Sequence, residues 1–198
     1  MRTARFDLVL LASILLLTGL GIVIIYSSSS HFAMMKFNDP SHMVVKHAQK
    51  LIVGVVVLFV TMKFKKETWK KLSAPIFLLG VLLCFIVFIK IDALTMTTKG
   101  ATRWISFQGI TFQPSEILKI GMILMLAKLL ERNQDQMHDL RMGLQRPLYL
   151  VGVVFFLIVM QPNYSMSGMI FIIALILIFL GGVRIKHLLC FLAISVPI

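Results

Sequence analysis

Long apolar runs alternate with short polar segments along most of this chain. Six of the runs are read as complete membrane spans, at residues 8–26, 47–64, 75–89, 113–130, 147–160 and 166–183. About 20 helical residues cross a hydrocarbon core of roughly 30 Å, and a span in lipid must satisfy its own backbone hydrogen bonds. A last run, at 188–198, predicts the start of a seventh span. The pattern therefore predicts an all-α, polytopic transmembrane helix bundle that forms one integral membrane domain over residues 1–198.

Composition supports a membrane protein and excludes an ordinary soluble domain. Hydrophobic residues make up 59% of the chain, charged residues only 14%, and the mean hydropathy is +0.94. A soluble domain carries a larger share of charged residues on its surface. The net charge of +12 does not indicate nucleic acid, because the Lys and Arg residues are spread over short loops between apolar runs. Membrane lipids are the expected surroundings, and no nucleic-acid partner is expected.

The distribution of basic residues predicts which side of the membrane holds the N-terminus. When the loops are assigned to alternating sides, thirteen of the 20 Lys and Arg residues share a side with the N-terminus and six lie opposite. The remaining one, Lys119, lies inside the fourth run. Cytoplasmic loops of membrane proteins carry an excess of Lys and Arg. The N-terminus is therefore predicted to be cytoplasmic, which puts the loop that contains Arg103 on the extracytoplasmic side.

Polar side chains gather where the fourth run begins. Gln113 and Ser115 flank a proline that suits the first helical turn, and Glu116 and Lys119 follow, three residues apart. Residues i and i+3 share one face of a helix, so the carboxylate and the ammonium group can neutralise each other. Charge inside a membrane is costly and usually functional. We predict that these four residues support a cavity, with a purely structural ion pair as the alternative.

A second polar cluster, in the loop before the fourth run, contains Lys99, Arg103 and Trp104. A guanidinium group binds phosphate through two parallel hydrogen bonds, and an indole ring favours the membrane interface. These three residues are predicted to bind substrate. The alternatives are membrane anchoring for Arg103 and Trp104 and a solvated boundary charge for Lys99.

Two motifs give the chain a resemblance to a known family. The segments G-A-T-R-W at 100–104 and F-Q-P-S-E-I-L-K at 112–119 resemble the signature of the SEDS family (FtsW, RodA, SpoVE). Y-S-S-S at 26–29, Q-P-N at 161–163 and G-G-V-R at 181–184 are similar to other parts of the family's first half. The first two of these segments are nearer FtsW than RodA. The resemblance implies a multi-pass protein of the bacterial plasma membrane with about ten spans, of which these residues are the N-terminal part.

The resemblance also implies an activity. SEDS proteins are peptidoglycan glycosyltransferases that polymerise lipid II, with an undecaprenyl-pyrophosphate-linked glycan as donor, for cell division or cell shape. The family's catalytic aspartate follows the seventh span, so no catalytic residue is expected before Ile198. A divalent cation at the full-length site and a class B penicillin-binding protein as partner are implied as well. Two other functions stay open: a lipid II flippase or transporter, and a non-catalytic membrane scaffold that binds this partner.

The chain itself shows no pattern for a cofactor or a metal. Its two cysteines, Cys84 and Cys190, lie in apolar runs, and its five histidines lack the spacing of zinc or haem sites. The sequence contains no phosphate-binding glycine-rich loop, dinucleotide fingerprint or hydrolase motif. Soluble kinase, hydrolase and redox classes are therefore excluded, and no cofactor or metal is predicted within these residues.

Overall fold

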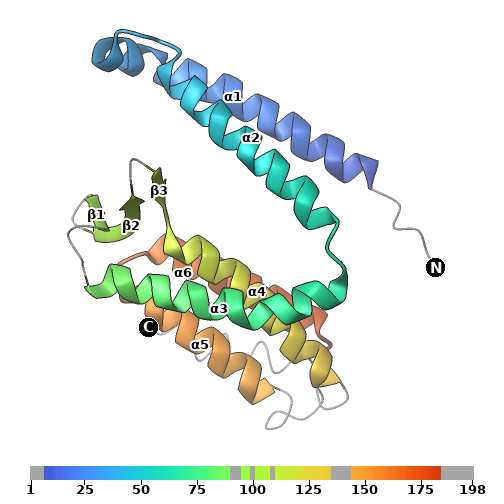
Figure 1. Cartoon of the computed structure of the whole chain (residues 1–198). Coiled ribbons are helices and arrows are strands. Elements are labelled where there is room, and N and C mark those ends of the chain that lie inside the picture. Colours follow the sequence, from blue (N-terminus) through green and yellow to red (C-terminus); the bar gives the residue numbers. More distant parts are fainter. Residues whose placement is uncertain (1–6, 90–94, 99–100, 108–109, 135–143, 184–198) are drawn as a thin grey trace. The chain divides into compact units, whose positions relative to one another are not determined.

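The computed structural model describes residues 7–89, 95–98, 101–107, 110–134 and 144–183. Its elements follow one another as α1, α2, α3, β1, β2, β3, α4, α5 and α6 (Figure 1). The chain divides into two compact units, Met1–Phe64 and Lys65–Ile198. Each unit has its own internal packing and is described by itself.

The first unit is a helical hairpin in which α1 covers Leu8–Phe37 and α2 covers His42–Met62. Asp7 caps the start of α1 by accepting a hydrogen bond from the Leu10 amide at 3.0 Å. Asn38 ends α1 in the left-handed conformation that commonly closes helices. Most large apolar side chains on both helices are exposed, which suits helices that meet lipid.

Helix α1 extends beyond the span predicted at 8–26. Ser28 and Ser29 lie inside the helix, and their hydroxyl groups donate to the Ile25 carbonyl at 3.3 and 2.5 Å. A hydroxyl group that bonds back to the preceding turn needs no other acceptor. The row of serines therefore does not stop the helix, which continues to Phe37.

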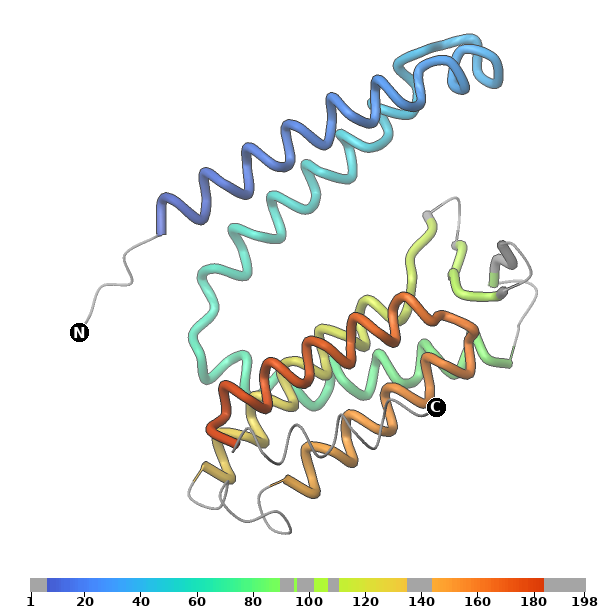
Figure 2. The backbone as a smooth tube through the Cα atoms, turned by 180° about the vertical axis from the view of Figure 1, so that it is seen from behind, coloured from blue at the N-terminus to red at the C-terminus, as the bar shows by residue number. Residues whose placement is uncertain are grey.

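The second unit contains four packed helices: α3 (Lys66–Ile89), α4 (Pro114–Arg132), α5 (Gln145–Val159) and α6 (Tyr164–Leu180). Helix α4 is central, because it packs against each of the other three (Figures 1 and 2). The shared core is mainly aliphatic and includes Leu118, Met122, Leu126, Val154, Ile158 and Ile170. This core holds the polar groups at the two ends of the bundle in place.

Two glycines set the distance between α3 and α4. A Cβ atom on Gly80 would lie 2.6 Å from the Cα atom of Leu118, and one on Gly121 would lie 2.6 Å from the Cα atom of Phe77. Each helix therefore presents a glycine to the backbone of the other, which lets the two helices approach closely. The same two contacts show that α3 and α4 run antiparallel.

A small antiparallel sheet connects α3 to α4. Its strands are β1 (Thr95–Thr98), β2 (Ala101–Phe107) and β3 (Ile110–Phe112), in the order β1-β2-β3. Strand β2 packs against α3 and α4, and its Ile105 is buried. The all-α prediction is confirmed for the six helices and misses this sheet, because its short strands depend on the packing of β2 against α3 and α4.

The helices confirm part of the predicted span count. By length and composition, α1, α2 and α3 can cross a membrane. Helices α5 and α6 are apolar but shorter, and α4 carries charged residues near both ends. Six complete spans therefore stay a prediction, and the run at 188–198 lies outside the described residues.

Candidate functional site

Helix α4 begins at the polar cluster that the sequence indicated. Gln113 occupies the N-cap position with an extended backbone, and Pro114 is the first helical residue. Proline suits this position, because a first-turn amide has no partner within the helix. The Gln113 carbonyl accepts a hydrogen bond from the Glu116 amide at 3.0 Å, while its side chain makes no capping bond. Backbone geometry therefore sets the helix start, and the Gln113 amide group is not used as a cap.

Glu116 and Lys119 form the ion pair that their spacing predicts. Lys119 Nζ lies 2.5 Å from Glu116 Oε2, and the lysine side chain is 17% exposed against 49% for the glutamate. The lysine is therefore the more covered partner, and the glutamate is the one that reaches the surface. The pair places a neutralised but polar group within the first two turns of an otherwise apolar helix.

Arg103 lies at a bulge in the sheet. In the β1–β2 pairing, Met96 is opposite Trp104 and Thr97 is opposite Thr102, so Arg103 has no opposing residue on β1. A bulge changes the direction of the extra residue's side chain and is common beside active sites. Arg103 Nε is buried and has no hydrogen-bond partner within the described part of the chain. Such a nitrogen favours an anionic or carbonyl acceptor from a ligand or from further polypeptide.

Two more buried polar atoms lie at the starts of α4 and α6. Ser115 Oγ and Asn163 Nδ2 have no hydrogen-bond partner among the residues that the structure describes. Asn163 is the N-cap residue of α6 and makes no capping bond. Buried polar groups in folded proteins are nearly always paired, so each exception calls for a ligand, a water molecule or more protein.

The turn between α5 and α6 joins this end of the bundle through Gln161. Its Nε2 atom donates to the Cys84 carbonyl, near the end of α3, at 3.1 Å, and the residue is buried. Because α3 and α4 are antiparallel, the end of α3 and the start of α4 share one end of the bundle. Gln161 and Asn163 were not among the predicted site residues. The signal for them was a polar Q-P-N segment in a turn too short to be solvated like a surface loop.

Predicted site residues are therefore found in two neighbouring elements, β2 and the start of α4, which pack against each other. Trp104 is 37% exposed, and Lys99 lies outside the described residues. Among the residues described, the structure contains no group of three His, Cys, Asp or Glu side chains that could hold a metal ion. The chemistry available here is that of cations, hydrogen-bond donors and one carboxylate.

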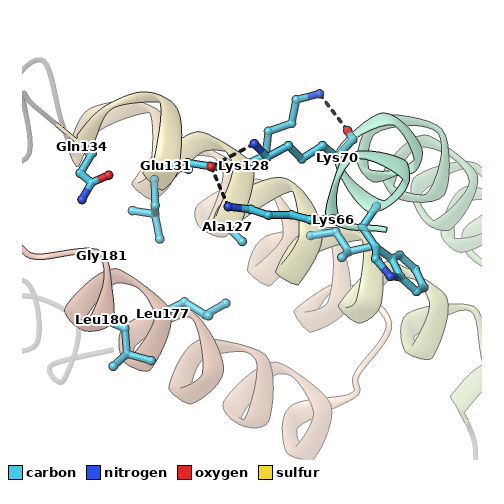
Figure 3. A pocket seen from close by; sticks show the side chains of 12 residues that line it. Lys66, Lys70, Ala127, Lys128, Glu131, Gln134, Leu177, Leu180 and Gly181 are labelled. Carbon is cyan, nitrogen blue, oxygen red and sulfur yellow. Dashed lines mark hydrogen bonds and ion pairs between the residues drawn. The ribbon is translucent and has the colours of Figure 1, made fainter. Parts of the chain in front are cut away.

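The opposite end of the bundle carries a basic groove, called here the lysine groove, which was not predicted from the sequence. The start of α3 and the ends of α4 and α6 line it, and its charged residues are Lys66, Lys70, Lys128 and Glu131 (Figure 3). Its volume is about 490 Å³. The basic run after the second span could have indicated part of this groove from the sequence. The residues of α4 that lie beside that run follow only from the antiparallel packing of α3 and α4.

Glu131 is the centre of the contacts in the lysine groove. Its Oε1 atom lies 3.0 Å from Lys66 Nζ and 2.9 Å from Lys70 Nζ. This carboxyl group lies after the apolar part of α4. Its pKa is below the usual range, mainly because Lys70 donates a hydrogen bond to it and, to a smaller extent, because Lys66 does. Lys128 Nζ donates to the Lys70 carbonyl at 3.2 Å. One carboxylate therefore orders two ammonium groups, and a third lies beside them.

Comparisons with known proteins agree with the motifs. The family model described as "Cell cycle protein" (FtsW/RodA/SpoVE) matches residues 7–198. A probable peptidoglycan glycosyltransferase FtsW from Geobacter sulfurreducens is 32% identical over 194 residues, which cover 98% of this chain and 52% of that protein. The protein of the same name from Coxiella burnetii is 31% identical over 180 residues, which cover 91% and 48%. The chain thus spans about half the length of these curated relatives.

Solved structures share the fold. The crystal structure of the rod shape determining protein RodA from Thermus thermophilus gives a TM-score of 0.65 at 22% identity, covering 86% of this chain and 56% of that one. A structure described as "Structural coordination of polymerization and crosslinking by a peptidoglycan synthase complex" gives 0.67 at 23% identity, covering 87% and 50%. These two likenesses show the fold alone. Because the family match covers nearly the whole chain, this protein belongs to the SEDS family, the FtsW/RodA/SpoVE group of multi-pass proteins of the bacterial cytoplasmic membrane.

Proposed function

We propose that this chain provides the N-terminal part of a peptidoglycan glycosyltransferase that polymerises lipid II for cell division or cell shape. One observation carries the proposal: β2, whose Arg103 keeps a buried and unpaired Nε, packs beside the start of α4 with its Glu116–Lys119 pair. Relatives named as probable peptidoglycan glycosyltransferases align over this whole region. We call β2 and the first two turns of α4 the substrate end of the bundle.

Arg103 is the proposed contact for the pyrophosphate of the lipid-linked substrate. Its guanidinium group can donate to two phosphate oxygens at once, and its buried Nε has an unused hydrogen. Trp104 follows it on the strand and is partly exposed, which suits an indole at the membrane interface. Lys99, which lies outside the described residues, is assigned to the same phosphate groups.

Gln113, Ser115, Glu116 and Lys119 are the proposed wall of the cavity that meets the sugar. The ion pair lowers the cost of placing charge in an apolar helix, and the covered ammonium group keeps hydrogens beyond the one it shares with Glu116. The unpaired Ser115 hydroxyl is both a donor and an acceptor, which suits a sugar hydroxyl. These residues position the substrate and do not transfer a proton in the proposal.

In the proposed reaction, the 4-hydroxyl group of a lipid II GlcNAc attacks the anomeric carbon of the MurNAc at the growing end. The new glycosidic bond forms with inversion, and the bond to undecaprenyl pyrophosphate breaks. A general base takes the hydroxyl proton, and cationic groups stabilise the leaving group. We propose that the base is an aspartate outside these 198 residues. A divalent cation at the full-length site stays part of the proposal, and no residue of this chain is assigned to hold it.

We further propose that the N-terminus is cytoplasmic and that the substrate end lies on the extracytoplasmic side of the bacterial plasma membrane. The charge count supports this orientation, with thirteen Lys and Arg residues on the side of the N-terminus and six opposite. A class B penicillin-binding protein is the proposed partner, in keeping with a fold neighbour described as a peptidoglycan synthase complex.

Lipid II polymerisation by the protein purified from its native membranes, through an N-terminal tag and with co-purifying partners, tests the proposal. We expect glycan strands on a gel. Arg103→Ala should lower the rate about tenfold or more, because a hydrogen bond to a charged group contributes about 1.5–3 kcal/mol. Lys46→Ala removes an exposed lysine of α2 and should keep the rate. Equal rates for the two variants would contradict the assignment of Arg103.

The same preparation separates the two alternative functions. Transport of labelled lipid II across a vesicle membrane, without polymer, is the result expected of a flippase. Co-purification of a penicillin-binding protein, with neither polymer nor transport, is the result expected of a scaffold. Either result would replace the glycosyltransferase proposal.

A further inference from the structure

The lysine groove lies at the end of the bundle opposite the substrate end, so the proposed glycosyl transfer does not explain it. Its walls come from three helices, α3, α4 and α6, that all belong to the second unit. The contacts of Glu131 tie the start of α3 to the end of α4 and hold the groove's shape. Figure 3 shows the charged side chains on α3 and α4 above apolar side chains of α6.

The groove has an excess of positive charge. Lys66, Lys70 and Lys128 face a single lining carboxylate, that of Glu131. A second carboxylate, on Glu67, lies 3.8 Å from Lys70 Nζ but does not line the groove. Lys128 has only a backbone carbonyl as a partner within the described part of the chain, and an ammonium group has three hydrogens to donate. Several N–H groups therefore remain for an anionic ligand.

Apart from Gln134, the other lining residues of the groove are apolar or glycine. They include Leu124 of α4, Leu177 and Leu180 of α6, and Trp69 of α3. In Figure 3, Leu177 and Leu180 lie below the charged side chains. A ligand that fits both parts has an anionic head and a hydrocarbon tail. A free anion such as inorganic phosphate matches only the lysines and leaves the apolar wall uncovered.

We propose that the lysine groove binds an anionic phospholipid, with its phosphate among Lys66, Lys70 and Lys128 and an acyl chain along the leucines of α4 and α6. Basic pockets between transmembrane helices bind anionic headgroups in this way, and each nearby lysine strengthens the attraction. The proposed orientation of the protein decides only which leaflet supplies the lipid, and it assigns the cytoplasmic leaflet. The site itself is independent of the proposed glycosyl transfer.

Trp69 provides a reporter inside the groove. These 198 residues contain two tryptophans, so Trp69 is the single emitter once Trp104 and any tryptophan outside these residues are replaced by Phe. The Trp104→Phe protein is placed in bilayers that contain equal mole fractions of brominated phosphatidylglycerol or brominated phosphatidylcholine. We expect stronger quenching by the anionic lipid. The preference for phosphatidylglycerol over phosphatidylcholine, measured as the ratio of their apparent affinities, should fall about fivefold for each lysine removed. The readout is fluorescence, so it does not depend on whether the protein polymerises lipid II.

Three variants in this background make the test specific. Lys70→Gln with Lys128→Gln should abolish the preference, and Lys70→Arg with Lys128→Arg should keep it. Lys46→Gln with Lys50→Gln removes the same charge from exposed positions of α2 and should also keep it. Equal quenching by the two lipids in the parent protein would overturn the proposal. Loss of the preference in the α2 variant would overturn it as well, because the effect would then be one of overall charge.

Discussion

The two members of the Glu116–Lys119 pair differ in exposure, and this difference decides what each contributes. The lysine side chain is 17% exposed and the glutamate side chain 49%. A charged group left without its partner costs most where water cannot reach it. At this site, the free energy of unfolding should therefore depend on which of the two charges is left behind.

We expect Glu116→Gln to lower the free energy of unfolding more than Lys119→Gln, by about 1–2 kcal/mol. The first change leaves the covered ammonium group unpaired, whereas the second leaves a carboxylate that water still reaches. The double variant, Glu116→Gln with Lys119→Met, should recover part of the lost free energy of unfolding, because it leaves no unpaired charge. Thermal unfolding in detergent shows which single variant is less stable. Equal losses of unfolding free energy for the two would contradict the expected order.

Gln161 gives a second prediction for a single residue. Gln161→Leu removes the hydrogen bond to the Cys84 carbonyl from a buried site, and we expect a loss of about 1 kcal/mol in the free energy of unfolding. Gln145→Leu, at an exposed position in the first turn of α5, is the matched control and should change stability little. If both changes have the same effect, the bond does not stabilise the turn.

Local spacing was enough to predict some of these contacts and not others. The ion pair follows from residues three apart on one helix, so it could be read from the sequence. The bulge at Arg103 depends on how β1 pairs with β2, and the burial of Asn163 depends on how α6 packs. Neither arrangement is encoded within a few neighbouring residues.

Helices α3 and α4 approach each other closely at two glycines. Gly80 and Gly121 lie against the backbone of the opposite helix, while Gly152 of α5 has no atom near its missing side chain. The same residue type therefore has different roles in neighbouring helices. Only the first two are needed for close packing.

We predict that Gly80→Ala and Gly121→Ala each lower the free energy of unfolding by about 1–3 kcal/mol, because the added methyl group would meet a backbone that cannot move aside. Gly152→Ala should be neutral or stabilising by up to about 1 kcal/mol, since alanine favours helix. Chemical denaturation in mixed micelles compares the three. A loss for Gly152→Ala as large as for Gly80→Ala would contradict the packing argument.

Helices were easier to predict than strands. The run at 113–130 became α4, Pro114–Arg132, and the run at 166–183 became α6, Tyr164–Leu180. A long apolar run in lipid must satisfy its own backbone hydrogen bonds, and a helix does this within the run. The sheet depends on short strands that meet only because β2 rests on α3 and α4, so its signal lay in tertiary packing.

Over the whole molecule, the second unit has two chemically different ends. The substrate end offers Arg103, an ion pair and unpaired buried donors, and the other end offers the lysine groove. Because α3 and α4 run antiparallel between the two ends, we expect the ends to lie at opposite faces of a membrane. The proposed orientation assigns the substrate end to the outside.

Cysteine labelling tests this orientation. In a background where Cys84, Cys190 and any cysteine outside these residues are replaced by alanine, we expect Asp39→Cys, between α1 and α2, to react with a membrane-impermeant maleimide in spheroplasts. Gln134→Cys, just after α4, should react only after permeabilisation. Both positions are exposed, so burial does not account for a difference. The reverse pattern would contradict the cytoplasmic N-terminus.

Photo-crosslinking of lipid II at the substrate end tests the proposed substrate site directly. The photoreactive residue p-benzoylphenylalanine replaces Trp104 in one protein and Phe156, an exposed residue of α5, in another. We expect crosslinking of labelled lipid II at position 104, weak labelling at 156, and a loss of about tenfold at 104 when Arg103→Gln is added. Equal labelling at both positions, or labelling at 104 that does not change with Arg103→Gln, would contradict the proposed substrate site.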